Sequence, residues 1–349
     1  MVAARRPRAL MLLAAVLLVA VPVAAATLHP VDYLALQAVR RALSDMPGSR
    51  FFASWDFTGD PCGFAGVSCS GDGRVVTLAL GDPRAGAPGA VPARSPAAGL
   101  ARLSELASLS LVPGRVIPPS LPLIRSLRTL VLSHNSLSGE IPKLVSSPLV
   151  HLDLRNNRLT GGVPPLPATL VYLSLAGNRF SGRVGGVLRR LPRLSFLDLG
   201  GNWFSGEVPG EVFSFRISYL QLRKNAFSGE LRPSGRVPAG ATVDLSHNAL
   251  SGRVPAELAP AAAVYLNGNK FAGQVPREIA AAAEGGRMRV LFLQDNFLTG
   301  IGVGGVPASA AVCAHMNCVA PPPPVVAACP AKGGRGRRRP PSQCGGRRR

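Results

Sequence analysis

An asparagine recurs through most of this 349-residue chain, each time behind the same apolar pattern. Residues 127–142, LRTLVLSHNSLSGEIP, show one unit in full, and later units repeat its Leu, Asn, Gly and Pro positions with 21 to 27 residues between asparagines. The phased residues are Asn135, Asn157, Asn178, Asn202, Asn225, Asn248, Asn269 and Asn296. A period of this length indicates a stack of short structural units rather than a globule with one core.

Each unit predicts a short β-strand followed by a turn. Leucines two apart, such as Leu152 and Leu154, point to the same side of a strand. Because all units run in the same sense, their strands must stack in parallel to bury that side. The asparagine amide can then pair with backbone groups of neighbouring units that would otherwise be buried without partners. We therefore expect a column of amides with a structural role.

The repeat resembles the plant-type extracellular leucine-rich repeat, LxxLxLxxNxLxGxIP, over roughly residues 31–300. The resemblance implies an α/β fold, a right-handed solenoid of about ten repeats over residues 74–300. It places short parallel strands on the concave face and irregular or 3-10 turns on the convex face. Two early units, around Leu80 and Leu111, lack the asparagine, and the sequence leaves open whether residues 81–100 complete a repeat. Extra residues at Ala280–Gly286 predict a bulge before Asn296.

The first 26 residues predict a secretion signal, with a basic start, an apolar run over 9–21 and small residues before position 27. The apolar run is short for a membrane-spanning helix, which needs about 20 residues. No later stretch is long and apolar enough to span a membrane. We therefore expect a secreted protein, in the extracellular space or the cell wall, with no transmembrane span in the mature chain.

Both ends of the stack need caps. Apolar residues on one face predict a helix over 31–46, ended by Pro47-Gly48, within an N-terminal cap spanning 27–73. This region resembles the N-terminal cap of plant repeat receptors, which implies a disulfide between Cys62 and Cys69.

At the other end, residues 301–320 are expected to form a C-terminal cap. The family often ends with a nearby cysteine pair, which implies that Cys313 pairs with Cys318. Residues 321–349 predict a disordered Pro/Arg-rich basic tail, in which Cys329 and Cys344 could pair with each other or with another chain.

Two columns of side chains on the strand face are candidates for ligand contact. The position before the first inner leucine is aromatic in four consecutive units, and the position after that leucine is Asp in alternate units. Exposed aromatic residues beside carboxylates suit a protein or peptide partner. Alternatively, the aromatics are merely tolerated on an exposed sheet and the carboxylates only solvate it. The candidate contacts are His151, Asp153, Tyr172, Phe196, Asp198, Tyr219, Gln221 and Asp244.

No catalytic constellation is evident. His134 and His247 occupy the same repeat position, which indicates repeat drift rather than a metal pair, and no nucleophile is phased with His151. Glycine pairs such as Gly304-Gly305 lack the P-loop lysine, and the kinase signatures are missing. We expect no enzymatic activity, no cofactor and no metal.

The net charge of +21 is concentrated at the two ends, where eleven basic residues leave about +10 for the remainder. For a secreted chain, acidic wall polysaccharide is a more accessible polyanion than nucleic acid, although the tail could equally be a solvated end. We expect an extracellular recognition protein, a kinase-less relative of repeat receptors, that binds a protein or peptide such as a receptor kinase ectodomain. The alternatives are an inhibitor of a polygalacturonase-type secreted glycosidase, and a wall-associated structural protein.

Overall fold

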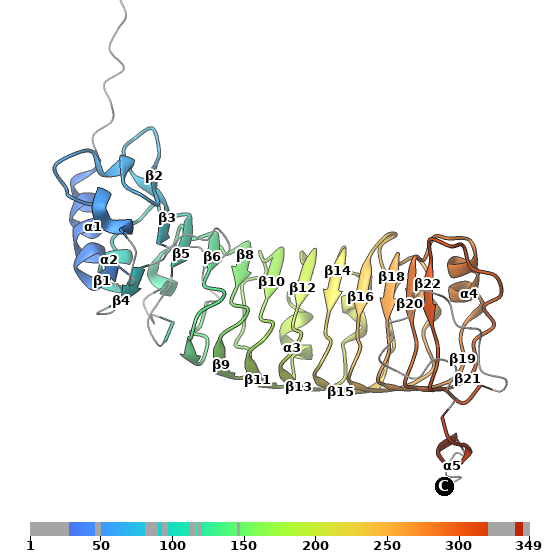
Figure 1. The fold of residues 1–349 in the computed structure, drawn as a ribbon. Helices are drawn as coiled ribbons and strands as arrows, with labels where there is room; N and C mark the ends of the chain where they lie inside the picture. The colour runs from blue at the N-terminus through green and yellow to red at the C-terminus, as the bar shows by residue number, and fades with distance from the viewer. Residues whose placement is uncertain are drawn as a thin grey trace, which may run out of the picture.

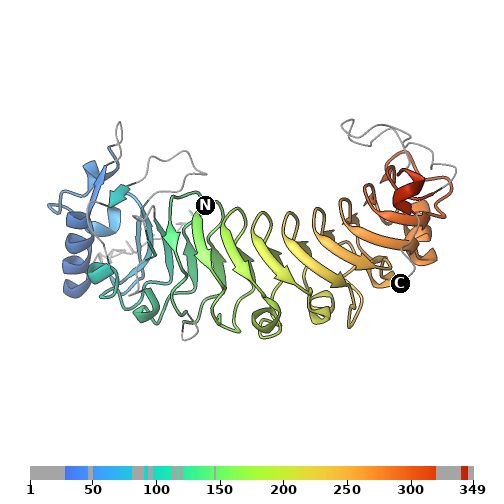
Figure 2. The same cartoon turned by 90° about the horizontal axis from the view of Figure 1, so that it is seen from below.

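The computed structural model describes residues 28–45, 50–80, 90–92, 97–111, 116–117, 121–144, 147–319 and 339–344. The predicted secretion signal and Cys329 lie outside these residues. The described part is an elongated, bowed stack that runs from the helix α1 (Pro30–Ala42) at one end to α4 (Arg277–Glu284) at the other (Figures 1 and 2).

Twelve strands form one sheet along the whole stack, here called the inner sheet. Its first pair is antiparallel, and every later pair is parallel and in chain order. The inner leucines are in register, so that Leu152, Leu173 and Leu197 pair across neighbouring strands. The strands are β2 (Val67–Cys69), β3 (Val75–Leu80), β5 (Ser108–Leu111), β6 (Thr129–Val131), β8 (His151–Asp153), β10 (Tyr172–Ser174), β12 (Phe196–Asp198), β14 (Tyr219–Gln221), β16 (Thr242–Asp244), β18 (Ala263–Tyr265), β20 (Val290–Phe292) and β22 (Ala311–Cys313). The predicted parallel solenoid is confirmed.

A second sheet of eight strands, not expected from the sequence, runs along the other edge of the stack (Figure 1). Each strand follows one of the phased asparagines, here called the ladder asparagines, and all of the strands except β21 reach a glycine with positive φ. At Gly252 a Cβ atom would lie 2.6 Å from Cγ of Glu230 in the preceding repeat, so only glycine fits there. The strands are β7 (Ser138–Gly139), β9 (Arg158–Gly161), β11 (Arg179–Gly182), β13 (Trp203–Gly206), β15 (Ala226–Glu230), β17 (Ala249–Gly252), β19 (Lys270–Gln274) and β21 (Phe297–Gly300).

Short helices close several repeats between the two sheets: three are 3-10 helices, as expected for this face, and two are α-helical. They are η4 (Leu121–Leu123), α3 (Gly185–Leu188), η5 (Gly210–Ser214), η6 (Ala256–Leu258) and α4. The extra residues before Asn296 form most of α4 rather than an open bulge. Ile279, Ala280, Ala282 and Ala283 are buried, because one face of this amphipathic helix packs onto the core.

The core is a continuous column of leucines with a row of phenylalanines behind it. Phe180, Phe204, Phe227 and Phe271 are completely buried. The rings of Phe180 and Phe204 stack with centroids 6.0 Å apart, and Phe227 continues the row at 6.3 Å. Each repeat therefore covers the apolar side of its neighbour, as a stack of units that cannot fold alone requires.

The column of asparagine amides has the geometry that the repeat predicts. In Asn178 the side-chain Nδ2 donates to the carbonyls of Leu154, at 2.9 Å, and Leu175, at 3.0 Å, while Oδ1 accepts from the backbone N–H of Leu159 at 3.0 Å. The amide thus joins two adjacent repeats. The same three bonds recur at Asn157, Asn202, Asn225, Asn248, Asn269, Asn296 and Asn317.

The residue before each ladder asparagine adopts the left-handed backbone conformation. In three repeats this residue is a glycine: Gly177, Gly201 or Gly268. In the other repeats a non-glycine residue adopts the same conformation, namely His134, Asn156, Lys224, His247, Asp295 and Met316. A non-glycine residue held there costs about 1 kcal/mol or more, which the amide ladder on the next residue offsets. The shared position of His134 and His247 therefore reflects turn geometry.

The N-terminal cap is held to the first repeat by a buried ion pair. The carboxylate of Asp32 in α1 is fully buried and accepts two bonds from Arg74, at 2.9 and 3.1 Å, and one from the N–H of Val75 at 2.8 Å. A disulfide joins Cys62 to Cys69, the pair implied by the family resemblance.

The predicted helix over 31–46 is too long. It ends at Ala42, because β1 (Leu43–Asp45) pairs antiparallel with β4 (Ala90–Pro92). Val31 and Leu34, assigned to the packed face, are 45 and 54% exposed. Part of the stretch 81–100 is thereby accounted for: β4 joins the cap, and α2 (Ala97–Leu100) packs on α1, where Gly99 approaches Val39 closely.

The C-terminal cap proves to be a further repeat. β22 pairs in parallel with β20, and Asn317 extends the ladder by one position. The sequence pattern concealed this repeat because Val312 and Ala314 replace the two inner leucines; both are buried.

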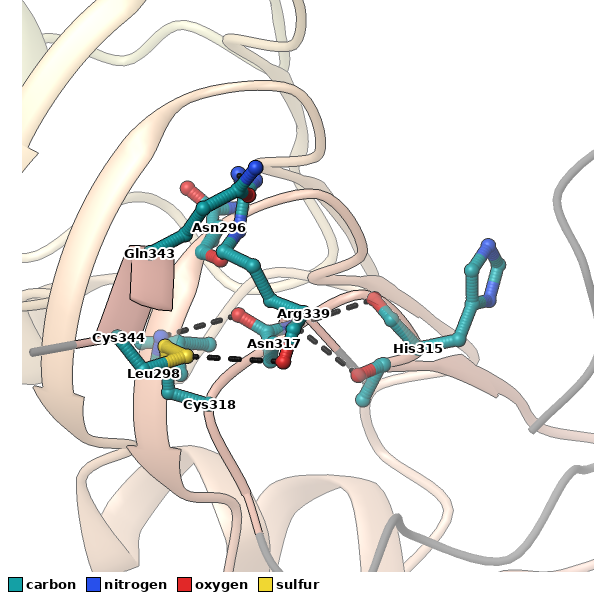
Figure 3. Close-up of a disulfide and its surroundings, with 9 residues drawn as sticks. Asn296, Leu298, His315, Asn317, Cys318, Arg339, Gln343 and Cys344 are labelled. Atoms are coloured by element: carbon teal, nitrogen blue, oxygen red, sulfur yellow. Dashed lines mark hydrogen bonds between the residues drawn. A yellow bond between two sulfur atoms is a disulfide. The ribbon is translucent and has the colours of Figure 1, made fainter. Parts of the chain in front are cut away.

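The implied pairing of Cys313 with Cys318 is wrong, since Cys318 pairs with Cys344 (Figure 3). Cys313 is also disulfide-bonded. The described part of the tail is ordered: α5 (Pro341–Cys344) lies against the last repeats, where the Nε of Arg339 donates to the carbonyl of Asn296 at 3.0 Å and its guanidinium lies 4.2 Å from the centre of the Phe297 ring. The disulfide and this arginine attach the tail segment to the last two repeats.

Replacement of a central ladder asparagine should destabilise the whole stack. In Asn202→Ala, two buried carbonyls and the N–H of Phe180 lose their partner. Because buried unpaired groups are costly, we expect a loss of about 3 kcal/mol in the free energy of unfolding, measured by urea denaturation. The matched control is Asn267→Ala, in which a half-buried amide bonded only to His247 is removed; it should change stability by less than about 0.5 kcal/mol. Equal effects of the two changes would refute the structural role of the ladder.

Removal of the terminal disulfide should loosen the last repeat alone. In Cys318→Ser with Cys344→Ser, we expect hydrogen exchange of the amides in β22 to accelerate about ten-fold or more, because repeats contact only their neighbours and ends open first. Exchange in β14, in the middle of the stack, should not change. Mass-spectrometric hydrogen exchange separates these segments. Unchanged protection of β22 would show that the tail does not stabilise it.

Candidate binding face of the inner sheet

The four aromatic residues expected on the strand face form one continuous stack. The ring centroids of His151 and Tyr172 are 4.0 Å apart, those of Tyr172 and Phe196 4.2 Å, and those of Phe196 and Tyr219 4.8 Å, with planes within 12° of parallel. The parallel strands enforce this arrangement, because side chains at one register position project side by side. All four residues are half-buried.

This stacking limits what the aromatic column offers to a ligand. Tyr172 and Phe196 have a ring against each face, so that only their edges point outward. Tyr219 differs because the next residue in the column is Thr242, which does not cover the ring. The column is thus a rigid wall, and its Tyr219 end borders a groove.

The aspartates of the second column serve the fold. Oδ1 of Asp153, Asp198 and Asp244 accepts from the backbone N–H two residues later, at 3.2, 2.9 and 3.0 Å respectively. The carboxylates thus stabilise the turn that leaves each strand. Asp153 is fully buried and Asp244 is 6% exposed, so neither presents the open carboxylate that the sequence suggested. Asp198 is half-buried, and its burial raises the pKa of its carboxyl above the ordinary value.

Arginines of the following column neutralise these carboxylates. Arg155 lies 3.3 Å from Asp153, and Arg223 lies 3.9 Å from Asp244. Arg223 also lies close to Gly200: a Cβ atom added to this glycine would be 3.2 Å from Cγ of Arg223. The glycine at position 200 therefore leaves room for the arginine to lie along the face.

A groove of about 610 Å³ opens beyond Tyr219. Here the first column becomes small, with Thr242 followed by Ala263, while the second becomes aromatic, with Tyr265 and Phe292 edge-to-face at 5.2 Å. Gln221 donates to the hydroxyl of Tyr219, and burial raises the pKa of that phenol. The groove is lined by Tyr219, Gln221, Arg223, Lys224, Thr242, Asp244, Ser246, His247, Tyr265, Asn267, Phe292, Gln294, Asp295 and His315.

The residues predicted from the sequence lie on one side of this groove, and those on the other side were not predicted. Tyr219, Gln221 and Asp244 line it, whereas His151, Tyr172 and Phe196 form the wall that leads to it. The missed residues follow the second inner leucine of each repeat, for example Arg223, Gln294 and His315. Each phased asparagine fixes the two positions directly before it, so the residues that follow the second inner leucine could have been predicted from the sequence.

The described residues contain no group of three His, Cys, Asp or Glu side chains that could hold a metal ion. The histidines near the groove make local contacts: Nε2 of His247 lies 3.2 Å from the amide of Asn267, and both ring nitrogens of His134 lie 3.3 Å from that of Asn156. Within the same described segments, no helix is long and apolar enough to cross a membrane.

Comparison with known families agrees with this architecture. The family model described as leucine rich repeat N-terminal domain matches residues 29–70, and the leucine rich repeat model matches residues 126–147 and 148–170. Receptor-like protein 35 of Arabidopsis thaliana is 32% identical over 146 residues, which is 40% of this chain and 15% of that protein. The probable receptor-like serine/threonine-protein kinase RPK1 of the same plant is 34% identical over 141 residues, 38% of this chain and 24% of that protein. The chain thus spans less than a quarter of the length of these relatives.

Solved structures share the fold. A plant ice-binding protein superposes with a TM-score of 0.66 at 24% identity, covering 86% of this chain and 99% of that protein. The structure of PEPR1–AtPEP1 gives 0.57 at 21% identity, covering 82% of this chain and 48% of that one. The two family models match the N-terminal cap and two of the repeats, and the structure has the parallel stack and asparagine ladder of a leucine-rich-repeat solenoid. The chain is therefore a leucine-rich-repeat solenoid that is similar to plant receptor-like proteins.

Proposed function

We propose that this chain is an extracellular recognition protein that binds an extended peptide, or an extended segment of a protein, along the inner sheet. The groove beyond Tyr219 carries the proposal. It is an open channel on a rigid sheet, with aromatic rings on its walls and exposed charged side chains at its rim. Buried aromatic anchors surrounded by polar groups are the usual source of binding energy in protein interfaces.

The comparisons support a binding role outside the cell. The matched relatives are receptor-like proteins and receptor-like kinases, and one structure of the same fold is of PEPR1 with AtPEP1. Because that structure is only 21% identical to this chain, it shows the shared fold and nothing about the ligand. The proposed class of ligand therefore depends on the groove alone. No catalytic step is needed for this function, because recognition by such a surface requires only complementary contacts.

The partner we favour is a peptide or a receptor kinase ectodomain. A secreted glycosidase is the alternative protein partner, and acidic wall polysaccharide is an alternative for the basic tail. A pull-down of extracellular proteins against the mature chain distinguishes them: a receptor ectodomain or peptide among the captured molecules supports the proposal. Capture of a glycosidase alone, or retention on pectin alone, contradicts it.

Ice binding is a third role to weigh, because the ice-binding protein shares nearly the whole stack. The second sheet does carry hydroxyl side chains at Ser181, Ser205 and Ser228, but each is paired with a residue other than serine on the next strand. However, the strands begin with exposed bulky or charged residues, among them Arg179 and Trp203. These projections break the flat, uncharged surface that contact with an ice lattice requires, so we do not propose this role.

Substitutions in the aromatic column should separate stability from binding. Tyr172→Ala removes two stacking contacts and should lower the free energy of unfolding by about 1–2 kcal/mol. Tyr219→Ala should weaken binding of the captured partner about ten-fold or more with a smaller loss of stability, because one ring face of Tyr219 lines the groove. Thermal unfolding and surface plasmon resonance measure the two effects.

Trp203→Ala is the matched control for this pair, since it removes an aromatic side chain that is 62% exposed on the second sheet. Its affinity for the partner should equal that of the unchanged protein. Loss of binding in Trp203→Ala with full binding in Tyr219→Ala would move the site to the second sheet.

A further inference from the structure

We propose that the groove selects a peptide segment carrying an acidic side chain and, about four residues away, a basic one. This inference rests on the proposed function and specifies its ligand. The selecting residues are Lys224 and Asp295, which line the groove and lie three repeats apart. Tyr265 and Phe292 line the groove between these repeats and can cover an apolar residue of the peptide.

Lys224 and Asp295 occupy equivalent places in their repeats. Each precedes a ladder asparagine and has positive φ, 52° at Lys224 and 59° at Asp295. The left-handed backbone directs both side chains outward from the turn that follows the inner strand, and both are exposed. Between them in the same row lie His247, which is bonded to Asn267, and Gly268. A positive and a negative charge therefore lie three repeats apart in one row.

The two charges are available to a ligand. Among the residues that the structure describes, neither Lys224 nor Asp295 takes part in an ion pair, whereas the neighbouring Arg223 lies 3.9 Å from Asp244. The other acids of the inner face are buried or bonded to backbone amides. The row of turns thus presents one uncompensated cation and one uncompensated anion, and a ligand of the opposite polarity complements them.

The spacing of the charges sets the spacing in the peptide. Lys224 follows β14 and Asp295 follows β20, with β16 and β18 between them. Three intervals of about 4.8 Å separate the two turns by about 14 Å. An extended peptide advances about 3.4 Å per residue, so its matching charges must lie about four residues apart.

A buried amide beside Asp295 is suited to bind the backbone of a peptide. Gln294, which precedes Asp295, is 9% exposed and lines the groove, and its Oε1 has no hydrogen-bond partner in the described structure. An unpaired amide oxygen is costly inside a protein. Rotation about the last side-chain bond, which has a broad energy well, turns the amide toward the groove, where a peptide N–H can pair with it.

The test uses synthetic decapeptides that are acetylated and amidated, so that neither terminus carries a charge. Each peptide has a central Tyr and two charged residues four positions apart, in the combinations Glu/Arg, Glu/Glu and Arg/Arg; a further Glu/Arg peptide has the charges adjacent. Isothermal titration at low salt measures their affinity for the mature protein. We expect the Glu/Arg peptide with four-residue spacing to bind about ten-fold more tightly than the other three.

Two charge reversals should redirect this preference. Lys224→Glu makes both ends acidic and should select the Arg/Arg peptide, whereas Asp295→Lys should select the Glu/Glu peptide. Because each variant gains a ligand, misfolding cannot imitate the result. Lys270→Glu, an exposed reversal on the second sheet, is the control and should keep the original preference.

Equal affinity for all four peptides, no binding of any peptide, or an unchanged preference in both variants would overturn the inference. None of these results affects the pull-down of a natural partner, which tests the proposed function independently.

Discussion

The asparagine amide that bridges adjacent repeats is the interaction on which the structure depends. A short strand exposes backbone groups where it turns, and in a stack these groups are buried between neighbours. One amide supplies two donors and an acceptor, and so it pairs the carbonyls of two successive repeats and an N–H of the preceding one. The spacing of the repeats is set at this point. The leucine column, the phenylalanine row and the left-handed residue before each asparagine all follow from keeping that amide in place.

The same regularity explains the chemistry of the inner face. Equivalent residues of successive repeats stand side by side, so that a favourable interaction in one repeat tends to recur in the next. The aromatic column stacks on itself, and the aspartates pair with the turns beneath them. Such columns strengthen the scaffold but leave little surface for a partner. Recognition is concentrated where the pattern changes, between Tyr219 and Phe292, because there a large residue is followed by a small one and a groove opens.

The ends of the stack were the least predictable part. Residues 311–317 form a complete repeat even though Val312 and Ala314 replace the leucines. These smaller apolar side chains are still buried, and Asn317 still makes the ladder hydrogen bonds. The pairing of Cys318 with Cys344 was equally hidden. The family resemblance implied Cys313 as the partner of Cys318, but Arg339 and Cys344 of the tail lie against the solenoid, where the Arg339 guanidinium packs on the Phe297 ring. The first helix is shorter than predicted for a related reason, because Leu43 lies in β1, which pairs with β4 from a distant segment.

The sequence by itself determined the repeat, its parallel strands and the structural role of the asparagines, because each of these depends on a local pattern that recurs every 21 to 27 residues. It also determined the N-terminal cap, because a local apolar helix face and a close cysteine pair identify it. Only the tertiary structure decided which candidate residues are open to a ligand. Asp153 and Tyr219 look alike as candidates in the sequence, yet one is fully buried and the other lines the groove. The difference arises from what neighbouring repeats place beside each residue. Such contacts join positions more than twenty residues apart, and no local pattern records them.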